Sequence, residues 1–350
     1  MPVLISDLWS PAEWVQAMRE RQATFPSLFL SGAVVRSDLF DAIASGAGTS
    51  VNVPFLKDIT DQGDEIQVEN TAPINDNGQP GDVQNWPLLN RVTKNSVSAL
   101  SAQVSGVDPM ASIIDQLVMR RLKQRQATML AMLRGLFGTG ATAANAAGCL
   151  SAVRSGGTLS EPFIENGAMA TGDNLMDPDK MIDSGVLMGE LEDGLRDGFL
   201  FMHPNVKARL RKLDRLNFKT TVMPSELPFT IESYCDMPII SSNALVRAGT
   251  GSGYVYDTYL ISKGVIGYGE KPQQGDTRDV ASLAYFFDRD KNNDLIWDRT
   301  RFLLGVNGTK WIGVPGAQSA TNAELQVPGN WTLVFQSASR VGVTCIRTNG

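Results

Sequence analysis

The sequence predicts an α+β protein in which one long helix lies between β-rich segments. Apolar residues recur at helical spacing over residues 109–137. Short alternating or β-branched runs precede and follow that helix, and Asn307-Gly308 between two apolar runs is a strong signal for a tight turn joining two strands. A chain of 350 residues with 43% hydrophobic residues has enough apolar material for about two domains.

Residues 1–50 form an apolar segment that proline and glycine interrupt repeatedly. A short helix is expected from about Pro11 to Gln22, because proline suits the first position of a helix. The remainder is expected to be an extended arm. It has little room for a core of its own, so we expect it to lie on the body of the chain or on a neighbouring copy.

Residues 51–100 are expected to form a long, partly irregular β excursion. Strand character recurs at Val51–Phe55, Glu65–Glu69 and Val92–Val104. The Asn-Asp-Asn-Gly-Gln-Pro-Gly sequence at 75–81 has strong turn chemistry. Because few large apolar side chains occur here, the segment is expected to be an interaction element or a disordered loop.

The clearest helix is expected at about 109–137. Asp108 is a good N-cap and Pro109 suits the first helical position, while Gly135 and Gly138 are expected to end the helix. Such a helix measures about 40 Å. Basic residues gather at its middle: Arg120, Arg121, Lys123 and Arg125. They indicate either a solvated helix face or a surface that pairs with acidic residues of an adjacent subunit.

The rest of the chain divides into three parts. Residues 138–178 are rich in small residues and are expected to be a loose connection. Residues 179–298 are expected to be an α+β block, with helices at about 179–195 and 204–214 and strands at about 237–241, 254–261 and 263–270. Residues 299–350 are expected to form a hairpin around Asn307-Gly308, with strands at 299–306 and 309–314, and a final strand pair near 331–335 and 341–346.

The residue types that catalytic and metal sites need are scarce. His203 is the only histidine, which excludes any site with two histidine ligands. The cysteines, Cys149, Cys235 and Cys345, are odd in number and widely spaced, so they indicate neither a disulfide framework nor a zinc site. Gly135–Gly140 lacks the lysine and hydroxyl residue of a phosphate-binding loop. We therefore expect no catalytic residue, no cofactor and no resident metal.

One segment, Asp288–Asp294, comes close to the pattern of a calcium loop. Its side-chain oxygens at positions 1, 3 and 5 fit, but position 12, where a bidentate glutamate is needed, is Arg299. A turn rich in Asp and Asn is the simpler interpretation, and a weak cation site stays open.

The charge balance argues against DNA binding as the main task. The net charge is −6 and the sequence pI is about 5.0, whereas proteins that grip DNA usually carry a basic face. The first 21 residues lack a signal-peptide pattern, and no apolar run approaches the roughly 18 residues that span a bilayer. We expect synthesis in a reducing cytosol and no membrane partner.

The order of these elements resembles the HK97-type fold of tailed-phage capsid proteins. Val53–Phe55 with Gly63–Glu65 is similar to the start of that fold's extended loop, and Ser105–Pro109 with Gly135–Gly138 is similar to the flanks of its spine helix. Phe201–Pro204 and Tyr254–Gly269 resemble the opening and central strands of its axial domain, and Thr321–Leu325 resembles its C-terminal strand region. One departure is Asn307-Gly308, where relatives of this branch often carry His-Pro.

The resemblance implies a major capsid protein that self-assembles into the icosahedral shell of a bacteriophage, and not an enzyme. It assigns 1–50 to an N-terminal arm, 51–100 to the extended loop (E-loop), 101–178 to a peripheral domain with the spine helix at about 109–137, 179–298 to the axial domain and 299–350 to the return into the peripheral domain. The implied location is the virion, after synthesis and assembly in the host bacterial cytoplasm.

The implied partners are first of all copies of this chain, arranged as pentamers and hexamers. Scaffolding, portal and decoration proteins are further candidates, and packaged double-stranded DNA is expected nearby without specific binding. Charge placement suggests that acidic residues of the extended loop pair with arginines on the long helix of a neighbour. The acidic residues are Asp58, Asp64 and Glu65, and the arginines are Arg120, Arg121 and Arg125.

Three other functions stay open on the sequence alone. The first is an encapsulin-like nanocompartment shell. The second is a soluble α+β enzyme with a catalytic domain at 179–315, and the third is a minor virion or tail component.

Overall fold

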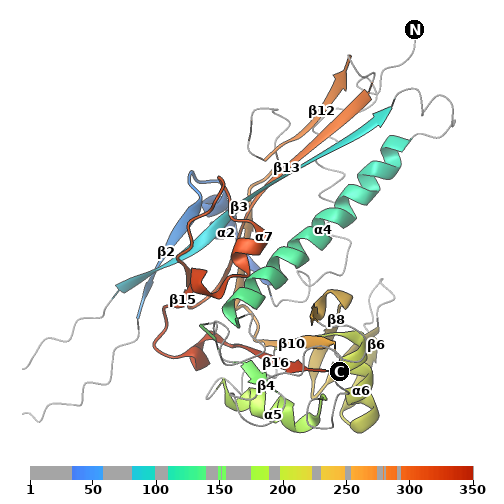
Figure 1. The fold of residues 1–350 in the computed structure, drawn as a ribbon, viewed down its shortest axis with the longest axis vertical. Helices are drawn as coiled ribbons and strands as arrows, with labels where there is room; N and C mark the ends of the chain where they lie inside the picture. Colours follow the sequence, from blue (N-terminus) through green and yellow to red (C-terminus); the bar gives the residue numbers. More distant parts are fainter. Residues whose placement is uncertain are drawn as a thin grey trace, which may run out of the picture.

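The chain folds into an elongated part and a compact lobe, which meet near one end of a long helix (Figure 1). The computed structural model describes residues 34–57, 81–98, 109–138, 149–150, 152–154, 175–188, 198–222, 230–248, 254–273, 279, 281–289 and 293–349. Each part has its own sheet, and the mixed helix–sheet architecture that the sequence predicts is confirmed. The expected N-terminal helix at 11–22 lies outside the described residues.

The elongated part is built on a six-stranded sheet. Its main path runs β1-β11-β13-β3-β2, and β12 pairs with the far half of β13. The strands are β1 (Val34–Arg36), β2 (Ser50–Leu56), β3 (Gly81–Ser98), β11 (Ile266–Glu270), β12 (Leu283–Asp288) and β13 (Asn293–Val306). β1 and β11 are parallel, and the other pairs are antiparallel.

β3 ties this sheet together because it is 18 residues long, against a usual strand length of about 5–6. Its first part pairs with β2, from Gly81 opposite Leu56 to Pro87 opposite Ser50. Its second part pairs with β13, as far as Ser98 opposite Asn293. The segment expected to be a β excursion at 51–100 therefore begins and ends with regular strands, β2 and β3, which pair with each other. The expected strand at 65–69 and the turn at 75–80 lie outside the described residues.

The long helix expected from the sequence is present as α4 (Pro109–Leu136), with 28 residues. It runs alongside the elongated sheet (Figure 1). Gly135 lies inside this helix and does not end it, which corrects the sequence-based prediction. A Cβ at Gly135 would lie 2.1 Å from the Leu325 carbonyl oxygen, so glycine here allows α7 (Asn322–Leu325) to pack against the helix. The chain turns out of the helix at Gly138, whose φ is +78°.

The compact lobe contains an eight-stranded sheet with the path β4-β16-β10-β5-β8-β7-β6, and β9 also pairs with β10. The strands are β4 (Ala152–Arg154), β5 (Phe199–Met202), β6 (Phe218–Val222), β7 (Thr230–Tyr234), β8 (Met237–Ser241), β9 (Val246–Ala248), β10 (Val255–Ile261) and β16 (Val343–Thr348). The short 3-10 helix η4 (Asn243–Leu245) joins β8 to β9. The connection expected to be loose at 138–178 thus supplies the edge strand β4, and its residues 139–148, 151 and 155–174 lie outside the described part.

Two helices pack on the lobe sheet, α5 (Pro178–Val186) and α6 (Pro204–Leu213). Met181 of α5 and Leu210 of α6 belong to the same buried cluster as Leu260 of β10 and Ile346 of β16. The helix expected at 204–214 is confirmed. The helix expected at 179–195 ends at Val186, and residues 189–197 lie outside the described part.

The Asn307-Gly308 turn is present, with Gly308 at φ +85°, but it does not close the expected hairpin. β14 (Thr309–Trp311) pairs with β15 (Trp331–Leu333), and Trp311 packs edge-on against Trp331 at 5.0 Å between ring centroids. β11 occupies one edge of β13 at Phe302–Val306, and β3 pairs with the other edge as far as Leu303, while β14 packs Trp311 against Trp331.

The expected pairing of the last two strands is also wrong. β16 does not pair with β15; it lies in the lobe sheet between β4 and β10. The remaining C-terminal elements are the 3-10 helices η5 (Pro328–Asn330) and η6 (Ala338–Val341). β16 carries Cys345 and Ile346, which are fully buried, so the apolar strand is covered by the lobe core.

Sheet membership moves the boundary between the two parts. The sequence predicts one α+β block over 179–298. In the structure β11, β12 and β13 belong to the elongated sheet, so the chain leaves the lobe after β10 and returns to it with β16. The strands at about 237–241 and 254–261 lie in the lobe as expected, whereas the strand expected at 263–270 begins at Ile266 and lies in the other sheet.

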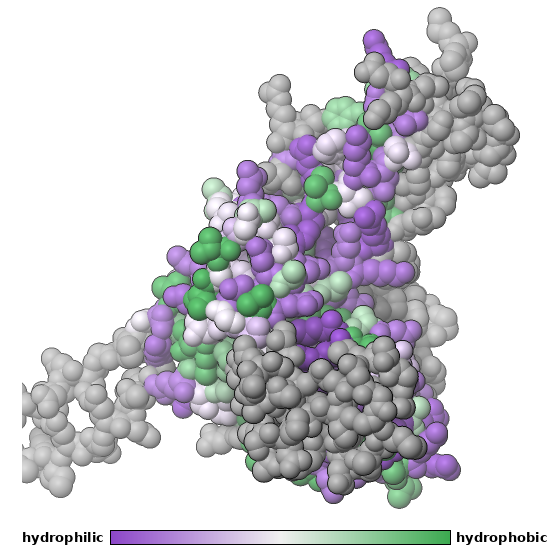
Figure 2. Space-filling model, in the orientation of Figure 1, coloured by the Kyte–Doolittle hydropathy of each residue, from purple (hydrophilic) through white to green (hydrophobic). Residues whose placement is uncertain are grey.

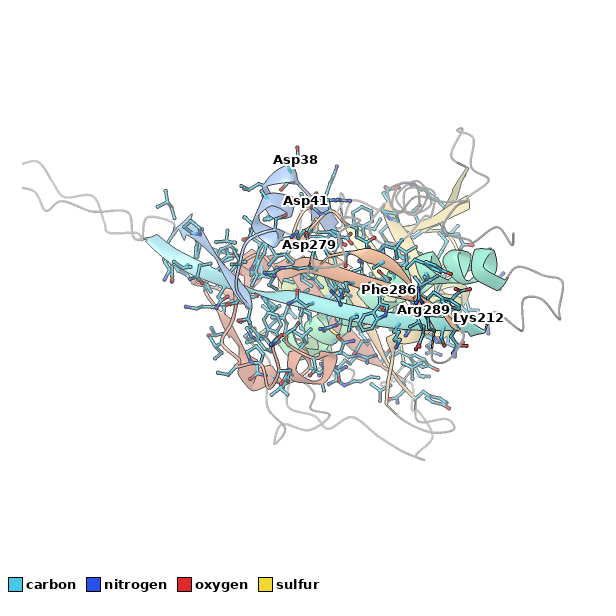
Figure 3. The ribbon with its side chains drawn as sticks, turned by 90° about the horizontal axis from the view of Figure 1, so that it is seen from above. Asp38, Asp41, Lys212, Asp279, Phe286 and Arg289 are labelled. Atoms are coloured by element: carbon cyan, nitrogen blue, oxygen red, sulfur yellow. The ribbon has the colours of Figure 1, made fainter. Side chains whose placement is uncertain are left out.

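A tryptophan fixes how α2 (Asp38–Ala44) sits on the elongated sheet. The indole of Trp86 lies directly over Gly267 and Gly305, which face each other on β11 and β13. Phe40 of α2 packs on the same indole at 5.5 Å. Seen from above, α2 with Asp38 and Asp41 lies on one side of β3, and Phe286 and Arg289 mark the far end of the β12–β13 hairpin (Figure 3).

We predict that Gly305→Ala destabilises the protein by about 1–3 kcal/mol, because overpacking a filled core forces side chains off their preferred rotamers. A Cβ at this position would lie 2.2 Å from Trp86 Cδ2. Gly329→Ala is the matched control, since nothing lies within 4 Å of a Cβ there. Denaturant unfolding of the purified variants measures both effects. Equal stability of the two variants would contradict the packing described.

Candidate functional site

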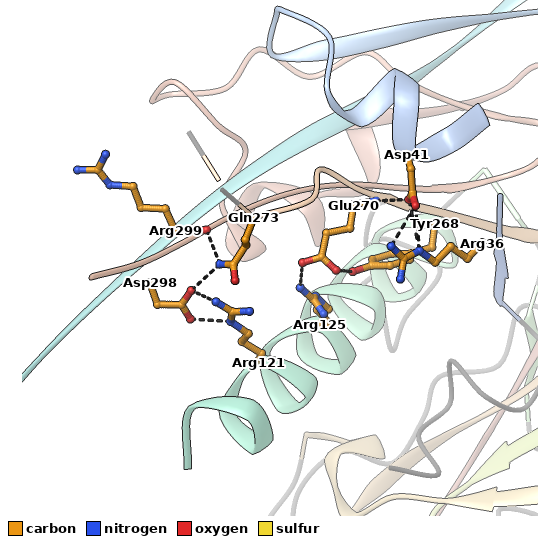
Figure 4. Close-up of polar contacts among 9 residues, drawn as sticks. All are labelled: Arg36, Asp41, Arg121, Arg125, Tyr268, Glu270, Gln273, Asp298 and Arg299. Atoms are coloured by element: carbon orange, nitrogen blue, oxygen red, sulfur yellow. Dashed lines mark hydrogen bonds and ion pairs between the residues drawn. The ribbon is translucent and has the colours of Figure 1, made fainter. Parts of the chain in front are cut away.

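Two buried arginines fasten α4 to the elongated sheet. Arg121 donates through Nε to Asp298 Oδ2 of β13 at 2.7 Å, and its Nη2 forms a second, shorter contact with Asp298 Oδ1 (Figure 4). The two side chains are 5% and 4% exposed, so the pair is almost fully removed from water. Gln273 Nε2 also donates to Asp298 Oδ1, at 3.1 Å. A planar guanidinium that grips a carboxylate at two points fixes the position of the helix as well as its distance from the sheet.

One turn further along the helix, Arg125 pairs with Glu270 of β11. The Arg125 guanidinium lies 5.7 Å from the ring centroids of Tyr268 and Phe302. Burial alone would lower the pKa of Arg125, but the carboxylates of Glu270 and Asp298 outweigh it and hold that pKa above its ordinary value. Burial raises the pKa of Tyr268 well above its usual range, so its hydroxyl stays protonated and donates to Glu270 Oε2 at 2.8 Å.

The same network reaches α2 on the other side of the sheet. The backbone N–H of Glu270 donates to Asp41 Oδ1 at 2.8 Å, and Arg36 of β1 pairs with Asp41 at 3.0 Å. Figure 4 shows these groups as one continuous set of contacts from α4 through β11 to α2. We call the Arg121–Asp298 and Arg125–Glu270 pairs the α4 ion pairs.

A second buried cluster joins the end of α4 to the lobe. Asp257 of β10 is fully buried and pairs with Arg347 of β16 at 3.2 Å and with Arg247 of β9 at 3.3 Å. Arg347 Nη2 donates to the carbonyl oxygens of Phe137 at 3.1 Å and Gly138 at 2.7 Å, and Arg247 Nη2 donates to Gly138 O at 2.6 Å. These carbonyls follow the last turn of α4 and lack a partner within the helix, so two lobe arginines supply the missing donors. We call this the Asp257 cluster.

The structure places the expected interface arginines in two different environments. Arg121 and Arg125 have partners within the chain, in place of the partners on a neighbouring subunit that the sequence analysis expected. Burying a guanidinium requires a fixed counter-charge, and Asp298 and Glu270 provide it. Arg120 is exposed, and its Nη1 lies 3.5 Å from Asn95 Oδ1. The expected acidic partners, Asp58, Asp64 and Glu65, lie outside the described residues.

The single histidine has a structural task. His203 caps α6: its Nδ1 accepts a hydrogen bond from the Asn205 N–H at 3.1 Å, and its ring lies 4.4 Å from that of Tyr256. Burial lowers the pKa of His203, which favours the neutral ring that this cap needs. Within the part of the chain that the structure describes, no three His, Cys, Asp or Glu side chains come together as a metal site would require.

The segment that resembles a calcium loop joins β12 to β13. Asp288 and Asn293 face each other across the two strands. Asp294 is buried and accepts a short hydrogen bond from Tyr285, so one of its oxygens already has a partner in the protein. Residues 290–292, which carry two of the expected ligands, lie outside the described part.

Exposed apolar side chains are spread along the elongated sheet. Leu56 is 67% exposed and Val92 is 62% exposed, and Phe286 and Phe287 are exposed near the far end of β12. Figure 2 shows apolar groups scattered among polar ones on the visible face of this part. None of the helices in the described ranges is long and apolar enough to cross a membrane.

Two of the three comparisons with known proteins find phage capsid proteins. No family model matches the chain. The major capsid protein of Bacillus phage SPP1 is 22% identical over 335 residues, which cover 95% of this chain and 94% of that protein. Among solved structures, the capsid of Ralstonia phage GP4 aligns with a TM-score of 0.57 at 11% identity, covering 92% of this chain and 90% of that one. The capsid of cyanophage P-SCSP1u aligns with a TM-score of 0.53 at 9% identity, covering 92% and 88%. The chain therefore shares its fold with phage capsid subunits.

We predict that Arg121→Met lowers the free energy of unfolding by about 3–5 kcal/mol, because it leaves the Asp298 carboxylate buried without its counter-charge. Arg120→Met, on the exposed side of the same helix, should change it by less than about 0.5 kcal/mol. Urea unfolding of the two variants beside the parent protein measures the difference. If both variants lost the same stability, the Arg121–Asp298 pair would not be what holds the helix.

For the Asp257 cluster we predict that Arg347→Met costs about 3–5 kcal/mol and loosens the end of α4, since a buried charge loses one partner and two carbonyls lose a donor. Backbone hydrogen exchange should become faster at Leu136–Gly138 and in β10 and β16. Lys263→Met, an exposed lysine in the turn between β10 and β11, is the control. Unchanged exchange in Arg347→Met would refute the coupling between the lobe and the helix.

Proposed function

We infer that this chain is the major capsid protein of a tailed bacteriophage, a subunit that forms the shell around the phage genome. The observation that carries this conclusion is the match to the SPP1 major capsid protein along 95% of the chain, because a shared shell role needs the whole subunit and not one motif. The fold shared with two other phage capsids agrees with it. The chain is a structural protein and not an enzyme, as its capsid relatives are, and it belongs to the virion.

We propose that the two parts of the molecule correspond to the domains of the HK97-type fold. The elongated sheet with α4 is the peripheral domain with its spine helix, and the lobe is the axial domain. The β2–β3 ladder is the base of the extended loop at 51–100, and residues 1–50 are the N-terminal arm. In this assignment the axial domain consists of β4, residues 175–262 and β16, and not of residues 179–298 as expected from the sequence. The reason is that β4 and β16 pair within the lobe sheet, whereas β11, β12 and β13 pair within the elongated sheet.

The proposed partners are first of all other copies of this chain, as pentamers and hexamers. Scaffolding, portal and decoration proteins are further proposed partners. Packaged double-stranded DNA is proposed to lie nearby without specific binding, and the chain is proposed to be synthesised in the host cytoplasm. The alternatives of an encapsulin-like shell, a soluble enzyme or a minor virion component are not favoured, because the curated relative that matches 95% of the chain is a major capsid protein.

We propose that the extended loop of one subunit pairs with Arg120 on α4 of a neighbouring subunit. Arg120 is exposed on α4, while Arg121 and Arg125 are occupied by their own acidic partners. Asp58, Asp64 and Glu65 of a neighbouring loop are the proposed counterparts. A surface pair of this kind contributes little stability and serves mainly to select the partner and its register.

We predict that Glu65→Lys slows or blocks assembly and that Glu65→Lys with Arg120→Glu restores it, because the double reversal recreates an opposite pair across the contact. The yield of assembled particles by size-exclusion chromatography measures the effect. Normal assembly of both single reversals would count against this contact without touching the shell function.

The shell function itself is tested by expressing the chain alone and with a candidate scaffolding protein. We expect closed shells, tubes or rings of five and six subunits in negative-stain electron microscopy. A monomer at every concentration, with no particles when the scaffold is supplied, would overturn the proposed function.

A further inference from the structure

A basic cleft of about 530 Å³ opens beside α6 at one end of the lobe. Among the described residues, four cations line it, Lys207, Arg211, Lys212 and Arg215, together with the carboxylate of Glu232 on β7. Lys207 pairs with Glu232 at 2.6 Å, and the more exposed Arg211 reaches it at 3.5 Å. Its described lining residues keep an excess of positive charge after these contacts, in a chain whose net charge is −6.

Two exposed leucines adjoin these cations in the chain, one as the last residue of α6 and one just after it. Leu213 is 51% exposed and Leu216 is 93% exposed. A strongly exposed leucine is common by itself, but two of them beside a charged cleft form a mixed surface of the kind found in protein contacts. Lys212, which lines the cleft and precedes Leu213 in the chain, is labelled in Figure 3.

The outer face of α5 has the complementary character. Ile182 and Asp183 follow Asp179 by three and four residues, and Val186 follows them by four and three, which places all four on one side of the helix. All four are exposed, Ile182 at 62% and Val186 at 65%. The opposite side of α5, with Met181, Ser184 and Gly185, is buried against the lobe.

These two surfaces lie toward opposite ends of the lobe sheet. α5 packs against β4 and β16, at the start of the strand order, whereas the cleft uses Glu232 of β7, near its other end. Arg209 Nε of α6 donates to Met176 O, just before α5, at 2.9 Å, so the two helices keep a fixed relation within one subunit. A surface and its complement at different places on one subunit give a head-to-tail contact, which closes into a ring when the rotation allows.

We propose that the outer face of α5 in one copy docks in the α6 cleft of the next copy around a ring of lobes. Asp179 and Asp183 meet the excess cations of the cleft, and Ile182 and Val186 cover Leu213 and Leu216. The contact rests on the proposed shell function and specifies which surfaces join the lobes. A second copy is the favoured occupant because it supplies both the opposite charge and the exposed apolar groups that the cleft and its rim present.

Charge reversal in the full-length protein tests this contact. Lys212→Glu and Asp183→Lys should each raise the protein concentration needed for half-maximal assembly by about tenfold or more, because each places like charges together. The double variant should return to within about threefold of the parent. Lys263→Glu, an exposed lysine outside both surfaces, is the matched control and should assemble as the parent does. Circular dichroism and the unfolding midpoint verify that each variant is folded.

The outcomes separate this contact from the function on which it rests. Folded single variants that assemble as the parent does would overturn the contact and leave the shell function standing. Loss of assembly in Lys212→Glu alone, without rescue by Asp183→Lys, would mean that the cleft holds another anion, such as nucleic-acid phosphate, and would also overturn it. A parent protein that forms neither shells nor rings would instead overturn the proposed function.

Discussion

The structure depends on the burial of two arginines of α4 against two carboxylates of the elongated sheet. A buried charge is costly unless a counter-charge meets it in good geometry, so Arg121–Asp298 and Arg125–Glu270 permit only one position of the helix on the sheet. Such pairs add little net stability compared with apolar residues, but removing one partner leaves an uncompensated buried charge, which is strongly destabilising. The apolar contacts of Met129, Leu133 and Leu136 supply the cohesion, and the ion pairs supply the register. For a shell subunit this matters, because neighbouring copies fit only if each presents its long axis in the same way.

The Asp257 cluster extends this constraint to the lobe. Its arginines come from β9 and from β16 near the C-terminus, and both donate to carbonyls that follow the last turn of α4. The lobe therefore holds the helix through polar groups that are buried and directional, in addition to the apolar cluster that contains Phe137 and Tyr259. The contacts at the end of α4 therefore set the orientation of the lobe relative to the helix.

The sequence predicts the elements better than their partners. α4, α6, β8 and β10 follow from periodicity, capping and β-branched content, because those signals are local. Pairing is not local: β16 joins β4 and β10, β14 joins β15, and β13 pairs with β3, β11 and β12 from distant parts of the chain. The same limit applies to the candidate site, because Arg121 and Asp298 lie 177 residues apart, and a cluster of basic residues on a helix does not reveal which carboxylates the fold brings opposite. Gly135 shows a further case, in which a glycine expected to end a helix instead allows α7 to approach it.

A cryo-electron microscopy map of assembled particles that resolves each copy in the asymmetric unit is the most direct test of this account. We expect α4 and the elongated sheet to superimpose as one body in every copy, with the Arg121–Asp298 and Arg125–Glu270 contacts intact. We expect differences between copies to be confined to the loop and the arm. An α4 that slides or rotates against β13 between copies, or ion pairs that are broken in some of them, would contradict this account.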